Sequence, residues 1–86
     1  MKVARTDRFK RAYQRLNQPQ RRAVKKALSF LVNNIRHPSL RVKKIEGTAG
    51  IWEARASKSI RLSFEFRDDT LILRNVSAHD EVLRGP

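Results

Sequence analysis

The chain has 86 residues, and its 20 Lys and Arg against 8 Asp and Glu give a formal net charge of +12 at pH 7. A chain of this length, residues 1–86, forms one domain and buries only roughly 60 to 65% of the surface that its unfolded form exposes, which argues against a deep internal pocket. Without cysteine there is neither a disulfide nor a thiolate nucleophile, and two isolated histidines give no basis for a metal site. The surplus of positive charge predicts an anionic partner, either nucleic acid or an acidic protein segment.

Targeting and membrane signals are missing from the sequence. Nothing in "MKVARTDRFK" resembles a signal peptide, and no apolar run approaches the roughly 18 residues of a membrane-spanning helix. We therefore expect a cytoplasmic protein without a membrane partner.

The N-terminal half predicts a short strand at residues 2–4 and then a helix hairpin. In "TDRFKRAYQRLN" apolar residues recur at helical spacing, with Thr6 or Asp7 as the cap. Pro19 suits the first position of a second helix. The two apolar stripes are Phe9, Ala12, Tyr13 and Leu16, then Val24, Ala27, Leu28, Leu31 and Ile35. The charge run Arg21, Arg22, Lys25 and Lys26 lies largely away from the second stripe and is typical of a solvated face.

The second half predicts strands. "HPSL" ends the helix, residues 40–45 are expected to be extended, and "EGTAG" is a turn. "IWEARAS" has both faces partly engaged, whereas "SIRLSFEFR" alternates strictly. Its core face carries Ile60, Leu62, Phe64 and Phe66, and its other face carries Arg61, Ser63, Glu65 and Arg67. Asp68 and Asp69 supply a hairpin turn, and "TLILRNV" predicts an interior strand.

The last predicted element begins at "SAHDEVL", where Ser77 is expected to cap a short helix with Asp80 as the second half of a capping box. His79 then falls in the first helical turn. The helix dipole and the surrounding cations oppose its protonation, so a neutral imidazole that accepts a proton is one hypothesis. The other is a solvated histidine in a terminal turn.

These elements define an α+β fold. A helix hairpin packs on one face of a small, mainly antiparallel, twisted sheet, and a short helical turn follows at the C-terminus. The stretch "IEGTAGIWEARASKSIRLSFEFRDDTLILRNVSAHDEVL" contains an L/I-W/Y-E-x-R strand, then I-R-L-x-F, and the ending V-x-x-H-D-E-V. In this order and spacing it resembles the RelE/ParE superfamily of bacterial and archaeal toxins, and the resemblance covers nearly the whole chain.

The resemblance implies a toxin regulated by an antitoxin, with helices on one sheet face and, in the ribonuclease members, messenger RNA on the other, concave face in the ribosomal decoding site. Such ribonucleases use the 2′-hydroxyl as nucleophile and need no metal or other cofactor. Arg61 matches the phosphate-stabilising arginine; a solvated strand charge is the alternative. Arg55 matches a basic position of the preceding strand, and pairing with Glu53 or Glu65 is its alternative. His79 falls where some members place an active-site histidine, which favours proton transfer.

Further residues are expected to contact RNA. They are Lys58 between the two strands, Arg41, Lys43 and Lys44 in the basic segment before them, and Leu83. Many ribonuclease members have tyrosine or phenylalanine where this chain has Leu83, and leucine supplies neither a stacking ring nor a proton. Trp52 is interpreted as a core anchor rather than as a replacement stacking surface.

The leading functional prediction is the toxin of a type II toxin–antitoxin system, a ribosome-dependent mRNA endoribonuclease that inhibits translation. The alternatives are a ParE-like inhibitor of DNA gyrase without nuclease activity and a catalytically degenerate RNA-binding relative. The presence of Arg61 and His79 favours the first, and Leu83 favours the others. The expected partners are a cognate antitoxin and mRNA on the ribosome, with operator DNA reached only through an antitoxin complex.

Overall fold

The computed structural model describes residues 1–78 and 81–86 of the chain. Within these residues, five strands form one sheet in the order β1-β5-β4-β3-β2, in which β1 runs parallel to β5 and the other neighbours are antiparallel. The strands are β1 (Lys2–Arg5), β2 (Lys43–Lys44), β3 (Ile51–Arg55), β4 (Ile60–Arg67) and β5 (Thr70–Ala78). The helices are α1 (Asp7–Gln14), α2 (Gln18–Asn33), the 3₁₀ turn η1 (Pro38–Leu40) and α3 (Glu81–Arg84). The predicted α+β class with a mainly antiparallel sheet is confirmed.

Both long helices begin with side-chain caps. The Thr6 hydroxyl accepts a hydrogen bond from the backbone N–H of Phe9 at 3.0 Å and so caps α1. At the start of α2, Asn17 and Gln20 form a reciprocal capping box with two bonds of 2.9 Å. Pro19 follows as the second helical residue, one position later than predicted.

The turn between α1 and α2 is closed by a basic residue that the sequence assigned to a solvated face. The guanidinium of Arg21 donates to the carbonyl of Gln14 at 2.6 Å and lies 5.9 Å from the ring centroid of Tyr13. It therefore caps the C-terminal end of α1, where unsatisfied carbonyls favour a cation.

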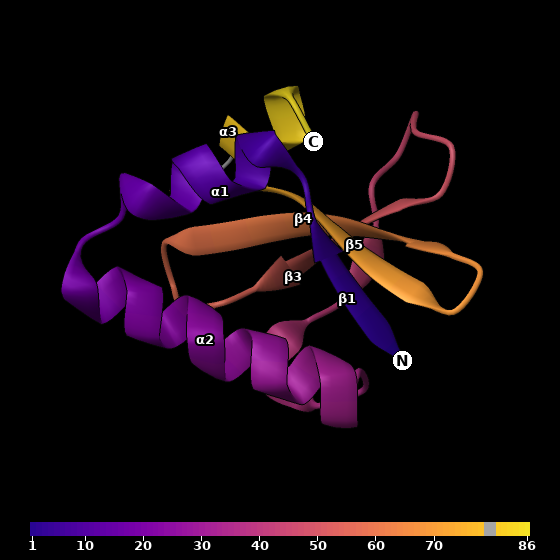
Figure 1. Cartoon of the computed structure of the whole chain (residues 1–86), viewed down its shortest axis with the longest axis horizontal. Helices are drawn as coiled ribbons and strands as arrows, with labels where there is room; N and C mark the ends of the chain where they lie inside the picture. The colour runs from indigo at the N-terminus through magenta and orange to yellow at the C-terminus, as the bar shows by residue number, and fades with distance from the viewer. Residues whose placement is uncertain (79–80) are drawn as a thin grey trace.

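The core lies between the helices and one face of the sheet. Phe9 of α1 and Leu31 of α2 are buried together with Leu62 and Phe64 of β4. Figure 1 shows α2 and α3 at opposite sides of the strands. The predicted strand alternation holds here, since the even-numbered residues Leu62 and Phe64 face α2.

Phe66 keeps the alternation but is not buried, although it was expected in the core. Its side chain remains 46% exposed, and its ring meets Phe64 edge-on with 5.7 Å between the ring centroids. Phe66 lies at the hairpin end of β4, next to the Asp68–Asp69 turn in which Asp68 has a left-handed φ of 54°. The helices that cover this face of the sheet do not extend to the hairpin end of β4.

The opposite face of the sheet, here called the open face, is partly covered by the end of the chain. The Ser63 hydroxyl donates to the Pro86 carbonyl at 2.9 Å, the Asn75 amide donates to the Gly85 carbonyl at 3.0 Å, and Arg74 donates to the Pro86 carbonyl at 3.1 Å. Ser63 does point away from the core face, as predicted, but it is fully buried because these last residues lie over it.

The predicted cap at Ser77 is wrong. Ser77 pairs with Arg61 across β4 and β5, so the strand continues through Ala78, and α3 begins only at Glu81. Continued pairing with β4 keeps Ser77 extended. His79 and Asp80, on which the rest of the capping prediction depends, lie outside the described residues.

The segment before β3 is extended over a shorter stretch than predicted. Only Lys43 and Lys44 form a strand, because η1 precedes them and Arg41 adopts a left-handed φ of 46°. Trp52 packs against the core, as expected of an anchor. Among the helices of the described residues, none has the length and apolar character to cross a bilayer.

Candidate functional site

The strand register places polar residues from three strands in rows on the open face. Arg55 of β3 pairs with Arg61 of β4, and Arg61 pairs with Ser77 of β5. The neighbouring row consists of Glu53, Ser63 and Asn75. Residues directly opposite each other on antiparallel strands have side chains about 5 Å apart. The row of Glu53, Ser63 and Asn75 is buried, whereas the row of Arg55, Arg61 and Ser77 retains access to solvent.

A small pocket of about 180 Å³ opens beside the Arg55–Arg61 pair. Its lining, here called the sheet cluster, consists of Arg41, Lys43, Glu53, Arg55 and Arg61. Four cations and one carboxylate come from β2, β3, β4 and the residue after η1. Such an arrangement attracts an anion, and it carries a group that accepts a proton.

Arg61 is held by the backbone of the β3–β4 connection. One of its terminal nitrogens, Nη1, donates to the carbonyls of Ser57 and Lys58, each at 3.1 Å. The described residues offer no acceptor to Nε or Nη2. The guanidinium is therefore oriented from one side, while the donors on its other side remain for a ligand.

Arg55 lies close to two other cations, Arg61 and Arg41. Partial desolvation lowers the pKa of its guanidinium from its usual range, and the charges of Arg61 and Arg41 lower that pKa further, whereas Glu53 acts in the opposite direction. An arginine remains protonated in proteins, so the cluster carries the positive charges of Arg55, Arg61 and Arg41 close together, and these charges repel each other. An anion bound there relieves that repulsion.

The ion pairing that the sequence left open for Arg55 is not formed among the described residues. Glu53 pairs instead with Lys43 at 3.4 Å, and Glu65 pairs with Arg67 at 3.0 Å and with Arg74 at 3.1 Å. Arg55 is therefore not used as a structural ion-pair partner in this part of the chain.

Glu53 is the site residue that sequence reasoning missed, since it entered only as a partner for Arg55. It is 6% exposed, and its Oε2 atom is buried without a hydrogen-bond partner among the described residues. A buried carboxylate oxygen that faces a basic pocket is costly unless a ligand or a proton satisfies it. The signal in the sequence was a carboxylate on the same strand face as Arg55.

The other candidates fall at different places. Lys43 belongs to the sheet cluster, but Lys44 pairs with Trp52 and lies on the opposite face of β2. Lys58 is exposed in the β3–β4 connection, and Leu83 is 39% exposed on α3; neither lines the cluster. His79 lies outside the described residues.

Comparison with known proteins identifies the fold. No family model matches the sequence, and no curated protein matches it. Solved structures do match. A chain of the RelB–RelE antitoxin–toxin complex from Methanococcus jannaschii aligns with a TM-score of 0.77 and 21% identity over 98% of this chain and 100% of that one.

Two further structures agree over almost the full length. The YoeB/ParE toxin from Agrobacterium tumefaciens has a TM-score of 0.78 and 16% identity over 92% of this chain and 99% of its own. YafQ from Escherichia coli has a TM-score of 0.78 and 12% identity, covering 93% of this chain and 94% of its own. The chain therefore has the RelE-like toxin fold, as its sequence motifs predicted.

Proposed function

We propose that this chain is the toxin of a type II toxin–antitoxin system and that it cuts messenger RNA on the ribosome. The observation that carries the proposal is the cross-strand pair Arg55–Arg61 on the open face with the Glu53 carboxylate in the same pocket. The RelE-like toxin fold supports the class of protein, and the sheet cluster supports the reaction.

Cleavage of RNA through its own 2′-hydroxyl requires three groups. A base takes the hydroxyl proton, cations stabilise the negative charge that grows on the phosphate as the 2′-oxygen attacks, and an acid protonates the leaving 5′-oxygen. The products are a 2′,3′-cyclic phosphate and a 5′-hydroxyl. Arg61 and Arg55 are assigned to the phosphate oxygens, because the planar arginine fork binds two such oxygens at once.

Two residues are candidates for proton transfer. Glu53 lines the same pocket as the arginines and has a carboxylate oxygen without a hydrogen-bond partner among the described residues, so it is assigned as the proton acceptor. His79 remains a candidate general acid or base on the strength of the sequence motif, and its test does not depend on its position. Lys43, Lys58 and Arg41 are assigned to the RNA backbone.

The proposed partner is an acidic antitoxin. The M. jannaschii RelB–RelE and E. coli DinJ–YafQ structures, which share this fold, are toxin–antitoxin complexes. A surface with a net charge of +12 suits an acidic chain. Operator DNA is then reached only through that complex.

The decisive experiment is a translation extract programmed with a defined message and followed by primer extension. We expect discrete cuts that require ribosomes and that disappear in Arg61→Ala, while Arg22→Ala, an exposed arginine of α2, cuts like the parent. Cuts in naked RNA at equal rate contradict the ribosome requirement, and no cuts with a folded protein contradict the nuclease.

One feature favours a second function. Leu83 supplies no ring where many ribonuclease members carry an aromatic residue, which fits a gyrase inhibitor better than a nuclease. Inhibition of gyrase supercoiling by the purified chain, together with intact messages in the extract, is the result that selects this alternative.

A further inference from the structure

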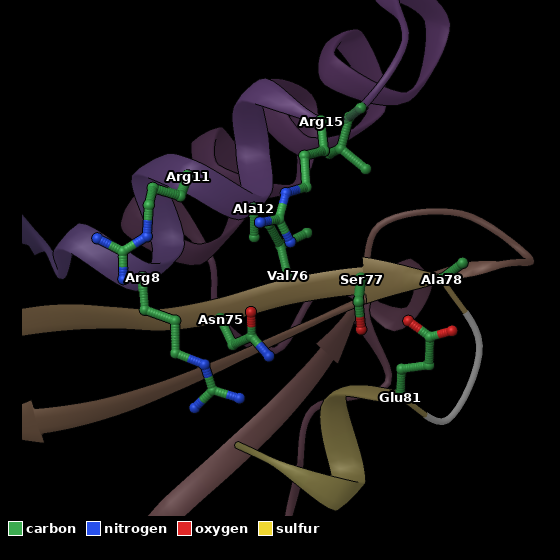
Figure 2. Close-up of a pocket in the computed structure, with 10 residues that line it drawn as sticks. Arg8, Arg11, Ala12, Arg15, Asn75, Val76, Ser77, Ala78 and Glu81 are labelled. Atoms are coloured by element: carbon green, nitrogen blue, oxygen red, sulfur yellow. The ribbon is translucent and has the colours of Figure 1, made fainter.

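A second basic hollow lies at the other side of β5 from the sheet cluster. It measures about 500 Å³ and is bounded by α1, the end of β5 and α3 (Figure 2). Arg8 and Arg11 of α1 and Arg15, its C-terminal cap, line one side, and Asn75, Ser77 and Glu81 line the opposite side. We call this hollow the α1 pocket.

The three arginines share one side of α1 because of their spacing. Residues at i, i+3 and i+7 fall on one helical face, and Phe9 between them turns to the core instead. With a rise of about 1.5 Å per residue, the basic edge from Arg8 to Arg15 is about 10 Å long. It is long enough to meet more than one negative charge of an extended ligand.

The charge of the α1 pocket is not neutralised within the described residues. The ion pairs among the described residues are formed by Glu53 and Glu65, and none of them involves Arg8, Arg11 or Arg15. Arg8 donates one hydrogen bond to the carbonyl of Gly85, which orients it without cancelling its charge. Glu81 is the only carboxylate in the described lining.

Ser77 connects this pocket to the sheet cluster. It lines the α1 pocket and also pairs directly with Arg61 across β4 and β5. Its Oγ atom is buried and has no hydrogen-bond partner among the described residues. A hydroxyl placed between two basic sites is suited to a ligand that passes from one to the other.

We propose that the α1 pocket binds backbone phosphates of the same RNA strand whose cleaved phosphate lies at Arg61. The inference rests on the proposed function and adds a second phosphate site on α1. Arginine forks, the Asn75 amide and the Ser77 hydroxyl are all donors that suit phosphate oxygens. RNA then crosses the strands from the sheet cluster, over Ser77, to α1.

The lining favours RNA over an acidic protein segment. A protein interface is anchored by large apolar or aromatic side chains at its centre. The exposed large apolar residues of the described chain are Met1, Val3, Val32, Phe66 and Leu83, and none of them lines the pocket. The apolar residues that do line the pocket, Ala12, Leu16, Val76 and Ala78, are buried or partly buried against the core, so they offer a peptide only a small apolar surface. An RNA backbone needs only the charge and the donors.

The test measures binding of a short, fluorescently labelled 2′-O-methyl RNA, which cannot be cleaved because it lacks a free 2′-hydroxyl. The variant Arg11→Gln/Arg15→Gln is compared with Lys10→Gln/Arg22→Gln, which removes the same charge from exposed positions outside the pocket. Thermal melts check that both fold. Fluorescence anisotropy between about 50 and 200 mM salt then gives affinity and its salt dependence.

We expect the pocket variant to lose about tenfold in affinity and its log–log salt slope to fall by about 1.4, since each phosphate contact with a single strand contributes about 0.7. The control variant keeps the slope of the parent. Adding Arg61→Gln to the pocket variant lowers the slope by about 0.7 more if one strand occupies both sites.

Other outcomes overturn the proposal. Equal slopes for the pocket and control variants remove the pocket from the RNA path, while ribosome-dependent cleavage by the parent would leave the proposed function standing. Unchanged RNA binding with lost affinity for a poly-glutamate peptide makes the pocket a protein site. No RNA binding by the folded parent overturns this inference, whereas the nuclease proposal is decided separately by ribosome-dependent cleavage in the extract.

Discussion

The two basic regions of the molecule differ in what holds their arginines. In the sheet cluster, two backbone carbonyls at 3.1 Å fix Arg61, and a buried carboxylate lies in the same pocket. In the α1 pocket, the side chains of Arg11 in α1 and of Arg15 at its C-terminal cap are exposed and form no hydrogen bond within the described residues. A preoriented cation suits the stabilisation of a transition state, whereas exposed cations suit affinity for a polyanion. The sheet cluster is therefore suited to catalysis of RNA cleavage, and the α1 pocket is suited to RNA binding.

The largest expected effect is at Arg61. Arg61→Lys keeps the charge but removes the fork and the two hydrogen bonds to the β3–β4 connection, so we expect cleavage in the extract to slow by about 100-fold or more. Anisotropy should show RNA affinity reduced only a few-fold. Cleavage at the parent rate by Arg61→Lys would mean that charge alone suffices and that the two regions do not differ in kind.

Glu53→Gln tests the carboxylate of the sheet cluster. If Glu53 accepts the 2′-hydroxyl proton, the variant should slow cleavage by about 100-fold while binding RNA at least as tightly, because a negative charge has left the site. The pH–rate profile decides its role: the limb that reports a carboxylate base should vanish. An unchanged profile with a lower melting temperature assigns Glu53 to holding Lys43 and the neighbouring arginines.

The proton-transfer hypothesis for His79 rests on the sequence motif. His79→Gln should preserve folding and RNA affinity yet slow cleavage by about 100-fold, with loss of the imidazole titration from the pH profile. Rates measured across the neutral pH range provide the check. Cleavage by His79→Gln at the parent rate with the parent pH profile would remove His79 from the catalytic assignment.

Two serines on the open face sharpen the comparison further. Ser63→Ala removes a buried hydrogen bond to the Pro86 carbonyl and should cost about 1 kcal/mol of unfolding free energy without changing RNA affinity. Ser77→Ala removes a buried hydroxyl that has no partner, so stability should hold or rise slightly while RNA affinity falls. Denaturant unfolding and fluorescence anisotropy on both variants test this prediction. If Ser63→Ala weakened RNA binding and Ser77→Ala did not, the RNA would contact the row of Ser63 rather than the row of Ser77.

The smallest expected effect is at Leu83, which is 39% exposed on α3. Leu83→Tyr supplies a ring without touching a basic residue, and we expect cleavage to rise a few-fold if a stacked base was unsupported. Leu83→Met is the matched apolar control. Equal rates for both variants would show that the missing aromatic residue does not limit activity.

Local patterns in the sequence were enough for the fold. The cap at Thr6, the apolar stripes, the strict alternation around Leu62 and the Asp68–Asp69 turn each act within a few residues, so they are readable without tertiary contacts. The wrong predictions concern residues whose burial or conformation depends on a neighbouring segment. Phe66 lies beyond the helical cover, and Ser77 is kept in β5 by pairing with β4.

The sequence by itself therefore determined the fold class and the basic character of the surface, and it predicted Arg55 and Arg61 as site residues. Only the tertiary structure decided which charges share a site. It separated Lys44 from Lys43, brought the buried Glu53 beside the arginines, and placed the arginines of α1 next to Ser77. Strand register and helix docking join residues that are distant in the chain, and no local periodicity encodes those distances.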